Sequence, residues 1–354
     1  MEKVIVFGTG RASEHFIKAD LNHTLFEVVA FADNNPDKHG QYFFDKKILS
    51  PKEIKNIEYD SIIIASSFYD EISKDLIEKY DISSEKIHNR YYKQDIQIQK
   101  RYREYYKKFE MDDRKEILQK TLPEDEQIIV YTAITGGFDQ LREPEIIDDN
   151  FKYVCFTDNN NFTSDIWDIR KIEIEDGDYN RTAKKIKVFP HIYFPDNSWS
   201  IWIDGQLQIT GDLRKLVNKY IRKSNLLCFL HQVRTCIQEE AEVCKLLGHD
   251  DAMVIDRQLK YIMSTGYKDD NELIAGGFLV RQHNEPDVIN LMNDWWEMIY
   301  AGSRRDQLSF NYVAWKNNFV FDITDLNIMD NEYIKRYSHK KIYKDKRRDN
   351  NEEK

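Results

Sequence analysis

The sequence predicts an α/β protein with two domains, a Rossmann-like parallel-sheet domain followed by a larger α/β domain. Two observations predict this class. Short apolar runs alternate with segments of helical pattern, which is typical of parallel strands covered by helices on both faces. The chain has 354 residues, and a typical domain size of about 150 residues favours two domains.

The first domain is expected over residues 1–93. Its predicted strands are residues 4–7, 28–31 and 61–65, and its predicted helices are residues 12–19 and a segment that begins at Ser50-Pro51. Proline is favoured in the first turn of a helix, which supports the second helix. Residues 94–125 are charged and aromatic up to Pro123, and they predict a helical connector.

A second α/β pattern occupies residues 126–326. Its predicted strands are residues 127–132, 153–158, 199–204, 225–230, 273–280 and 319–321. Its predicted helices are residues 236–247, 255–264, 287–301 and 306–315. Residues 327–354 end in a run of charges, and we predict that they form a C-terminal tail.

Charge and composition exclude several classes of protein. The net charge is -10, which argues against a nucleic-acid partner because phosphate binding needs clustered positive charge. No apolar run reaches the roughly 18 residues of a membrane-spanning helix, and the N-terminus lacks a signal-peptide pattern. The four cysteines form no CxxC pair, which disfavours a zinc site and favours reduced thiols. We therefore expect a cytoplasmic protein.

A glycine turn follows the first predicted strand. Gly8 and Gly10 can let the backbone approach a phosphate at a helix N-terminus. Asp33 ends the second strand, where a carboxylate can bond a ribose hydroxyl. Ser13 occupies the third position of the GxGxxG fingerprint, so the motif is incomplete.

This segment resembles the small Rossmann-like domain that is fused to many bacterial polysaccharide-biosynthesis enzymes, including sugar acyltransferases. The matching stretches are residues 4–10, 31–34, 50–54 and 60–65. The resemblance implies one of two roles, and both stay open. Either Gly8, Gly10 and Asp33 bind a nucleotide or nucleotide sugar, or the domain is a degenerate docking domain.

Asp204 is the strongest candidate for a ligand-binding residue in the second domain. It follows the apolar residues 201–203, so we expect it at the carboxyl edge of a buried strand, where open α/β sheets bind ligands. A carboxylate there can hold Mg²⁺ or Mn²⁺ against a sugar-nucleotide diphosphate. The alternative is a structural aspartate that caps a turn with Gly205.

Other candidate residues lie on both sides of this strand. The spacing of Arg181, Lys184 and Lys185 predicts one cationic helical face that can meet a diphosphate. The alternative is a solvated face. His283 is a candidate metal ligand or a structural histidine, and Asp306 begins a predicted helix, where it can be a simple N-cap.

Six motifs in fixed order carry a second resemblance. They are residues 130–139, 154–158, 184–191, 200–205, 231–241 and 303–310. The stretch of about 127–325 resembles the GT-A-type glycosyltransferase family of plant mucilage-pectin transferases and their bacterial homologues, long known only as a domain of unknown function. The resemblance implies a GT-A-like α/β domain that transfers a sugar, with retention, from a nucleotide sugar such as a UDP-sugar to a glycan or lipid-linked acceptor.

The resemblance also implies roles for single residues. The donor-binding residues would be Thr132, Gly136, Gly137, Asp158, Arg181, Lys185, His231, Glu239 and Glu240. Within this set, Arg181 and Lys185 would face the diphosphate, and Asp158 would lie near the base or ribose. Asp204 would be the first acid of a DxD-like motif for Mn²⁺ or Mg²⁺. Asp306 and Gln307 would be the catalytic pair beside the anomeric carbon.

The motif departs from the family pattern at one position. Gln206 replaces the second acid of DxD, and an amide oxygen is a poorer ligand than a carboxylate. Three possibilities stay open: the metal is weakly held, Asp204 and His283 suffice, or no metal is required.

Other functions also stay open. The protein is alternatively a non-catalytic nucleotide-sugar-binding or scaffold protein, or a hydrolase, since a plant relative has been associated with ceramidase activity. No Ser-His-Asp elbow or HExxH motif supports a hydrolase. The domain fusion and the Ile-, Lys- and Asn-rich composition suggest bacterial capsule or surface-polysaccharide synthesis by analogy. The enzyme would then meet the membrane peripherally through its acceptor.

Overall fold

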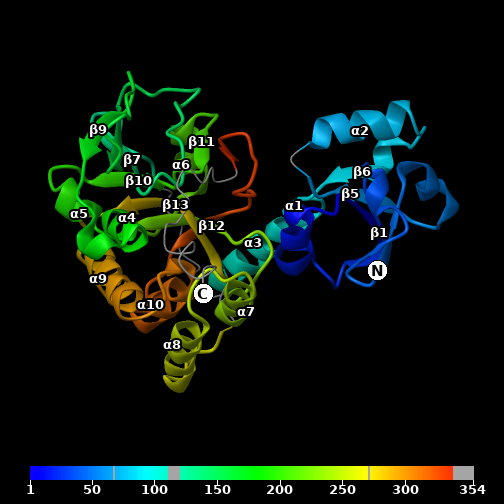
Figure 1. Cartoon of the computed structure of the whole chain (residues 1–354). Helices are drawn as coiled ribbons and strands as arrows, with labels where there is room; N and C mark the ends of the chain where they lie inside the picture. The colour runs from blue at the N-terminus through cyan, green and yellow to red at the C-terminus, as the bar shows by residue number, and fades with distance from the viewer. Residues whose placement is uncertain (67, 111–119, 270–271, 338–354) are drawn as a thin grey trace, which may run out of the picture. The chain divides into compact units, whose positions relative to one another are not determined.

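The chain folds into two compact units (Figure 1). The structure is a computed structural model, and it describes residues 1–66, 68–110, 120–269 and 272–337. The units comprise Met1–Gln97 and Ile98–Lys354. Both are mixed α/β units, as the sequence predicts.

The first unit is built on a six-stranded sheet with the order β3-β4-β2-β1-β5-β6. Its strands are β1 (Glu2–Phe7), β2 (Phe26–Ala32), β3 (Tyr42–Phe43), β4 (Lys46–Leu49), β5 (Ser61–Ile64) and β6 (Ile87–Asn89). The neighbouring strands are parallel except for the β3–β4 hairpin. Alternate residues of β1 enter two different apolar clusters, with Ile5 in one and Val6 in the other. The sheet is therefore covered on both faces, as its apolar runs predict.

Short helices surround this sheet. They are α1 (Arg11–His15), which continues as a π-helix over Phe16–Asp20, α2 (Tyr69–Glu78), and three 3-10 helices over Pro36–Lys38, Pro51–Asn56 and Ser84–Lys86. The helix predicted at Ser50-Pro51 is thus a 3-10 helix. Its start is fixed by a capping box, because the Ser50 N–H donates to Glu53 Oε2 over 2.8 Å.

The second unit contains a seven-stranded sheet with the order β14-β12-β13-β10-β7-β8-β9. The strands are β7 (Ile128–Ile134), β8 (Phe151–Thr157), β9 (Asp168–Lys171), β10 (Trp199–Ile203), β12 (Leu226–Leu230), β13 (Ile274–Gln282) and β14 (Asp322–Thr324). Only β13 within this order runs antiparallel to its neighbours. The carboxyl ends of β7, β8, β10 and β12 consequently meet at one edge of the sheet.

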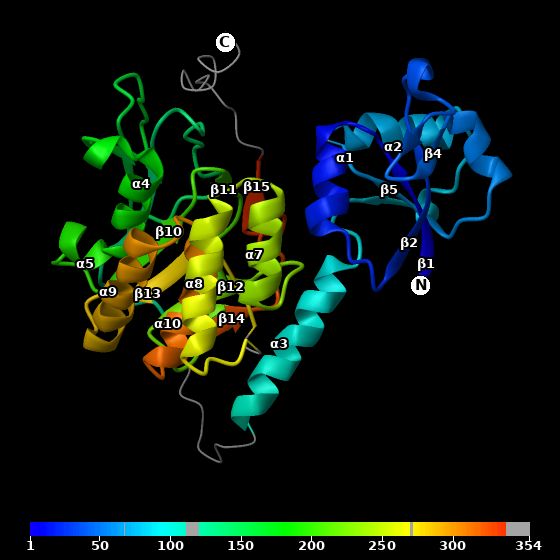
Figure 2. The ribbon, with the colours of Figure 1, turned by 60° about the horizontal axis from the view of Figure 1, so that its bottom comes forward.

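Helices cover one face of this sheet, where α4, α9 and α10 pack beside the central strands (Figure 2). The helices are α3 (Gln94–Glu110), α4 (Tyr179–Val188), α5 (Pro190–Tyr193), α6 (Leu213–Tyr220), α7 (Ile237–Leu246), α8 (Ala252–Ser264), α9 (Pro286–Ala301) and α10 (Phe310–Lys316). Two 3-10 helices span Glu175–Gly177 and Asp306–Leu308. Trp202 from β10, Ile186 from α4 and Trp295 from α9 share the buried core.

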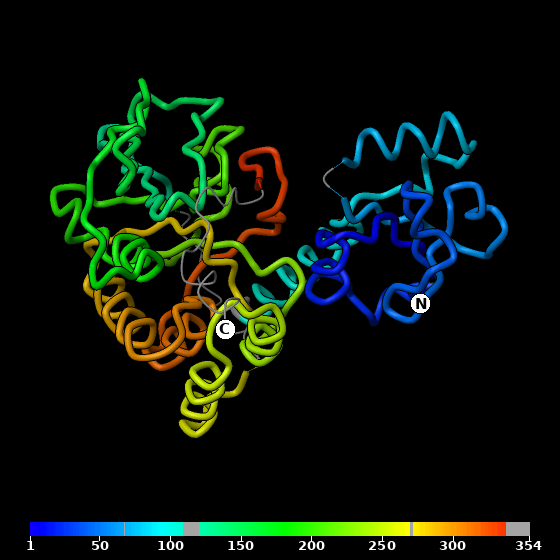
Figure 3. Tube along the Cα trace, viewed as in Figure 1, coloured from blue at the N-terminus to red at the C-terminus, as the bar shows by residue number. Residues whose placement is uncertain are grey.

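Two predicted boundaries differ from the structure. The strand predicted at residues 319–321 is instead β14, because Val320 is 52% exposed and the pairing with β12 begins at Asp322. The predicted tail begins too early, because β15 (Ile334–Arg336) pairs with β11 (Leu207–Ile209), and the two traces run side by side in Figure 3. Residues 111–119 of the predicted connector and residues 338–354 of the predicted tail lie outside the described residues.

The described helix of the connector belongs largely to the second unit. Ile98 and Tyr106 of α3 lie in its core. The Tyr106 hydroxyl donates to Asp322 Oδ1 over 3.1 Å and accepts the Ile323 N–H over 3.0 Å. This hydroxyl ties α3 to the edge strand β14.

We expect Tyr106→Phe to lower the free energy of unfolding by about 1–3 kcal/mol, because two buried polar groups lose this partner. Urea unfolding of purified variants measures the effect. Tyr300→Phe is the matched control, since Tyr300 is 65% exposed and a surface change alters stability by about 0.5 kcal/mol or less. Equal stabilities of the two variants would show that the hydroxyl does not hold α3 in place.

Candidate functional site

The turn after β7 is held by a carboxylate that follows β8. Gly136 (φ 61°) and Gly137 (φ 64°) both adopt the left-handed conformation that favours glycine. The Gly136 N–H donates to Asp158 Oδ1 over 3.0 Å. The structure therefore brings together three of the predicted donor-binding residues at the carboxyl edge of the sheet.

Two aromatic rings flank this turn. A Cβ on Gly136 would lie 3.0 Å from ring atoms of both Phe138 and Tyr179. Both side chains are exposed, so their rings are available to a planar ligand beside the turn. Thr132 does not belong to the turn, because it lies inside β7 opposite Cys155 and is buried. The structure therefore places Thr132 outside the turn, and its contact with the nucleotide stays a prediction.

Asp204 lies at the same edge, directly after β10. Its N–H donates to the Gly277 carbonyl over 2.8 Å, and its Oδ1 accepts the Trp202 indole N–H over 2.7 Å. The side chain is half-buried. At the third position of the DxD-like motif, Gln206 Oε1 accepts from Arg336 Nε of β15 over 2.9 Å.

Asp306 is held by two lysines from α4. Its Oδ2 accepts from Lys184 Nζ over 2.8 Å and from Lys187 Nζ over 2.5 Å. The Lys187 side chain is fully buried, and its ammonium also donates to the Gly276 carbonyl over 2.5 Å. The group of Lys184, Asp306 and Lys187, called here the lysine-aspartate triad, therefore carries one excess positive charge.

The triad fixes the charge of Asp306. Burial by itself raises the pKa of this carboxyl, but the charges of Lys184 and Lys187 outweigh burial and hold the pKa well below its ordinary value. Burial lowers the pKa of Lys184, and the Asp306 charge more than restores it. Burial is the larger effect at Lys187, whose pKa is lowered. Asp306 is consequently an anion at neutral pH and a poor proton donor or acceptor.

Two consecutive glycines connect Asp204 with the triad. The Gly276 carbonyl accepts from Lys187, and the Gly277 carbonyl accepts from the Asp204 N–H. A Cβ on Gly276 would lie 3.0 Å from Lys187 Nζ, and one on Gly277 would lie 3.4 Å from Asp204 Oδ2. The start of β13 therefore needs small residues so that both charged groups can approach the backbone.

Gln307 also belongs to this edge. Its Nε2 donates to the Ile274 carbonyl over 3.1 Å, and its Oε1 accepts from Arg305 over 3.4 Å. The two residues predicted as catalytic, Asp306 and Gln307, thus both contact the first residues of β13. Their catalytic roles stay predictions.

Arg181, Lys184 and Lys185 all lie on α4, as predicted, but their side chains have different partners, and the contact of Arg181 and Lys185 with a diphosphate stays a prediction. The Arg181 guanidinium donates to the carbonyls of Ile299 and Gly302, over 3.3 and 2.9 Å, at the end of α9. Lys185 pairs with Glu175 over 2.7 Å. The three long side chains diverge because each finds a different partner.

Lys187 was missed as a site residue. Its sequence signal is a lysine within the apolar residues 186–189, three positions after Lys184. Residues three apart lie on the same side of a helix, and both side chains reach Asp306.

His283 lies far from Asp204. In the antiparallel register of β10 and β13, Trp199 pairs with Gln282 and Ile203 pairs with Phe278. His283 is therefore opposite Ser198, just before the start of β10, whereas Asp204 follows its end, six residues or about 20 Å away at 3.3 Å per residue. The prediction that both hold one metal ion is wrong. Burial lowers the pKa of His283 to about 4, and its Nε2 contacts the Phe194 carbonyl at 3.0 Å.

The amino end of β10 borders a cavity of about 770 Å³. Ser198, Trp199 and Gln282 are among its lining residues, so the cavity lies at the edge opposite to Asp204. Its walls contain none of the predicted site residues, and the cavity is separate from the candidate site.

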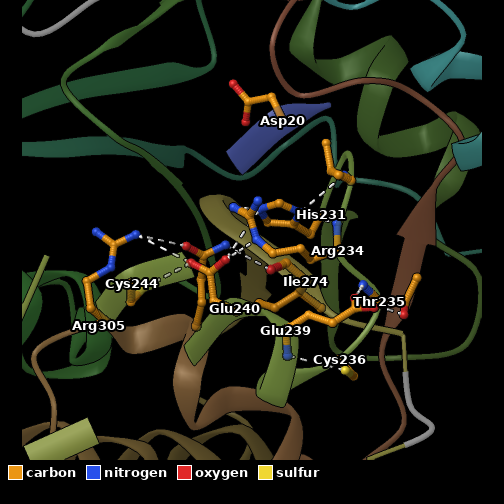
Figure 4. A network of polar contacts seen from close by, with 12 residues as sticks. Asp20, His231, Arg234, Thr235, Cys236, Glu239, Glu240, Cys244, Ile274 and Arg305 are labelled. Carbon is orange, nitrogen blue, oxygen red and sulfur yellow. Dashed lines mark hydrogen bonds and ion pairs between the residues drawn. The ribbon is translucent and has the colours of Figure 1, made fainter. Parts of the chain in front are cut away.

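A second network lies at the carboxyl end of β12 (Figure 4). The buried Glu240 forms ion pairs with Arg234 and, at 3.7 Å, with Arg305. His231 Nδ1 accepts the N–H groups of Val233 and Arg234 over 3.2 and 2.9 Å. Burial and then the neighbouring arginines hold the pKa of His231 well below its ordinary value, so its imidazole is neutral.

Glu239 has a different position from Glu240. Its Oε2 accepts the Thr235 N–H over 2.9 Å at the start of α7. The carboxylate thus fixes the residue that precedes the N-cap, Cys236. Its donor-binding role stays a prediction, while Glu240 and His231 lie in the network beside Arg305, next to Asp306 in the chain.

The N-terminal glycine turn is held closed by Asp33. Its Oδ2 accepts from the Thr9 N–H and from Lys38 Nζ, both over 3.0 Å, and its Oδ1 accepts the Asn35 N–H over 2.9 Å. Gly8 (φ 105°) allows a close approach to Ser13, whereas a Cβ on Gly10 would meet no atom within 4 Å. Both Asp33 oxygens are therefore engaged, and its binding to a ribose stays a prediction.

Within the described part of the chain, no group of three or more His, Cys, Asp or Glu residues is arranged to hold a metal ion. The described helices include none with the length and apolar character needed to cross a membrane.

Comparison with known families agrees with this architecture. Residues 56–341 match the TOD1/MUCI70 family, described as a glycosyltransferase-like domain. This chain belongs to that family. Residues 1–88 match the family described as C2185-like, N-terminal. The resemblance of the second domain to plant mucilage-pectin transferases and their homologues is thereby confirmed.

The TOD1/MUCI70 family includes a curated plant relative. Over 215 residues the chain is 24% identical to the probable hexosyltransferase MUCI70 of Arabidopsis thaliana. The alignment covers 52% of this chain and 37% of the relative, so the chain spans little more than a third of that protein. The edge with Asp158, Asp204 and Asp306 lies inside the glycosyltransferase-like domain.

We expect Asp306→Asn to lower the free energy of unfolding by about 3–5 kcal/mol, because Lys187 would stay buried without its anion. Asp204→Asn is the control. Its amide oxygen can still accept the Trp202 N–H, so the loss is about 1 kcal/mol or less. Urea unfolding measures both variants, and equal losses would contradict the structural importance of the triad.

We also expect Asp306→Asn to change how the free energy of unfolding depends on pH in acid. The folded pKa of Asp306 is lowered, so its contribution is present above the unfolded pKa of about 3.9 and is lost as pH falls below it. The wild type should lose stability more steeply below about pH 4 than Asp306→Asn. Parallel stability curves for the two proteins would contradict this assignment.

Proposed function

We propose that this protein transfers a hexose from a nucleotide sugar to a hydroxyl group of a glycan or lipid-linked acceptor. One observation carries the proposal: in a chain of a glycosyltransferase-like family, the Gly136 turn, Asp204 and the lysine-aspartate triad occupy the same edge of the sheet. That edge is where open α/β sheets bind ligands. Surface-polysaccharide synthesis in bacteria is the proposed pathway.

The donor nucleotide would bind beside the turn after β7. Phe138 and Tyr179 offer exposed rings for stacking on a base. The Asp158 carboxylate, which fixes the Gly136 N–H, stands where it can also reach the base or ribose. A UDP-sugar is the proposed donor.

The sugar would then lie between Asp204 and the start of β13. In the transfer, the acceptor oxygen attacks the anomeric carbon, the bond from that carbon to the diphosphate breaks, and its electron pair leaves with the nucleoside diphosphate. An inverting reaction needs a base to take the acceptor proton. Asp306 is a poor base for this step, since its pKa is held low by two lysines. Retention of configuration is the proposed outcome, as the family resemblance implies.

Donor consumption tests the proposal. UDP-, GDP- and CDP-hexoses are screened for nucleoside diphosphate release with and without simple glycosides as acceptors. We expect one donor to be consumed, and Asp204→Asn to lower kcat/KM by about 10²–10³-fold, the usual loss for one polar group at a reacting centre.

Lys316→Met is the control for this screen. It removes an exposed lysine that pairs with Asp294 over 3.1 Å, away from the carboxyl edge, and should leave turnover unchanged. Binding of a nucleotide sugar without turnover by the wild type would favour a non-catalytic binding protein. Absence of both binding and turnover would exclude the transferase proposal.

A further inference from the structure

Cations outnumber carboxylates in two adjoining groups of side chains at the carboxyl edge of the second unit. Asp306 is shared by Lys184 and Lys187, and Glu240 is shared by Arg234 and Arg305. Each group of three therefore has one excess positive charge. Arg305 and Asp306 are neighbours in the chain, so the two groups adjoin. Even with the charge of Asp204 included, this part of the edge favours an anionic ligand.

The residues present do not fit a resident divalent cation. Such ions prefer several oxygen ligands, but Gln206 Oε1 is engaged by Arg336 and the Asp306 Oδ2 atom by two ammonium groups. Asp204 Oδ1 already accepts the Trp202 N–H, which leaves Oδ2 as a single carboxylate oxygen for an ion. The ammonium groups of Lys184 and Lys187 would also repel a metal cation placed beside them. The donor set thus departs from the expected DxD-like site.

We propose that the triad, through Lys184, neutralises the leaving nucleoside diphosphate and that this step requires no divalent cation. The inference rests on the proposed transferase function. Lys184 is the member suited to contact the ligand, because its side chain is 16% exposed whereas that of Lys187 is fully buried. Asp306 takes one of its three ammonium N–H donors.

Lys187 acts as a positioning residue. Its ammonium holds Asp306 to the Gly276 carbonyl, which in turn orients Lys184. Its backbone carbonyl accepts from the Tyr131 hydroxyl over 2.7 Å and from the buried Arg281 over 2.8 Å. These contacts fix the end of α4 before any ligand binds, so the cations need little reorganisation when charge develops.

The chemistry balances without a further reactant. The electron pair of the broken bond stays on the diphosphate, whose terminal oxygen gains negative charge. The Lys184 ammonium meets that charge with hydrogen bonds and keeps its proton, because Asp306 raises the pKa of Lys184 against the effect of burial. The acceptor proton leaves with the diphosphate or with solvent.

Calorimetric titration with UDP, GDP and CDP tests the inference, with the full chain in EDTA and again in Mn²⁺. We expect one nucleotide to bind with similar affinity in both conditions. Lys184→Met should weaken that binding by about 10–100-fold, the loss expected for one charge-assisted contact. Lys184→Arg should recover most of the affinity, and Lys316→Met should bind like the wild type.

The outcomes separate this inference from the proposed function. Binding that needs Mn²⁺, or equal affinities of Lys184→Met and Lys316→Met, would overturn the inference and leave the transferase proposal standing. No binding of any nucleotide in either condition would overturn both. Thermal unfolding of each variant identifies a loss of fold, and Lys184→Arg keeps the charge if Lys184→Met does not fold.

Discussion

Burial of the Lys187 ammonium is the constraint on which the second unit depends. A charge without water is costly unless it is paired and hydrogen-bonded, and Lys187 is satisfied only where α4, the start of β13 and Asp306 meet. This requirement fixes the end of α4 against the sheet. It also places Lys184, one turn earlier, at the edge where the Asp204 strand ends. The burial of Lys187 therefore determines both the packing of α4 and the position of Lys184 in the candidate site.

The antiparallel strand β13 organises the site around this constraint. It enters the sheet between β10 and β12 and starts at their carboxyl edge. Its first residues include Gly276 and Gly277, whose carbonyls accept from the triad and from Asp204. The same direction of β13 carries His283 to the opposite edge.

The electrostatic potential at this edge follows from two carboxylates that are each shared by two cationic side chains. Asp306 and Glu240 each neutralise one cation and hold a second. Such an arrangement keeps buried charges paired and still leaves a positive potential for an anionic ligand. The proposed transfer, which would release a nucleoside diphosphate, needs such a potential at the bond that breaks. Stability and the proposed chemistry thus use the same residues.

The sequence by itself determined the α/β class, the central strands and the position of Asp204. Apolar runs indicate buried strands, and a residue that directly follows such a run lies at the edge of the sheet. It also indicated the Gly136 turn and Asp158. Tertiary structure alone decided that Lys187, and not Arg181 or Lys185, meets Asp306, because helical spacing does not reveal which partner a long side chain reaches. It alone separated His283 from Asp204 and moved the last strand to β14, since strand direction and register depend on pairing between distant segments.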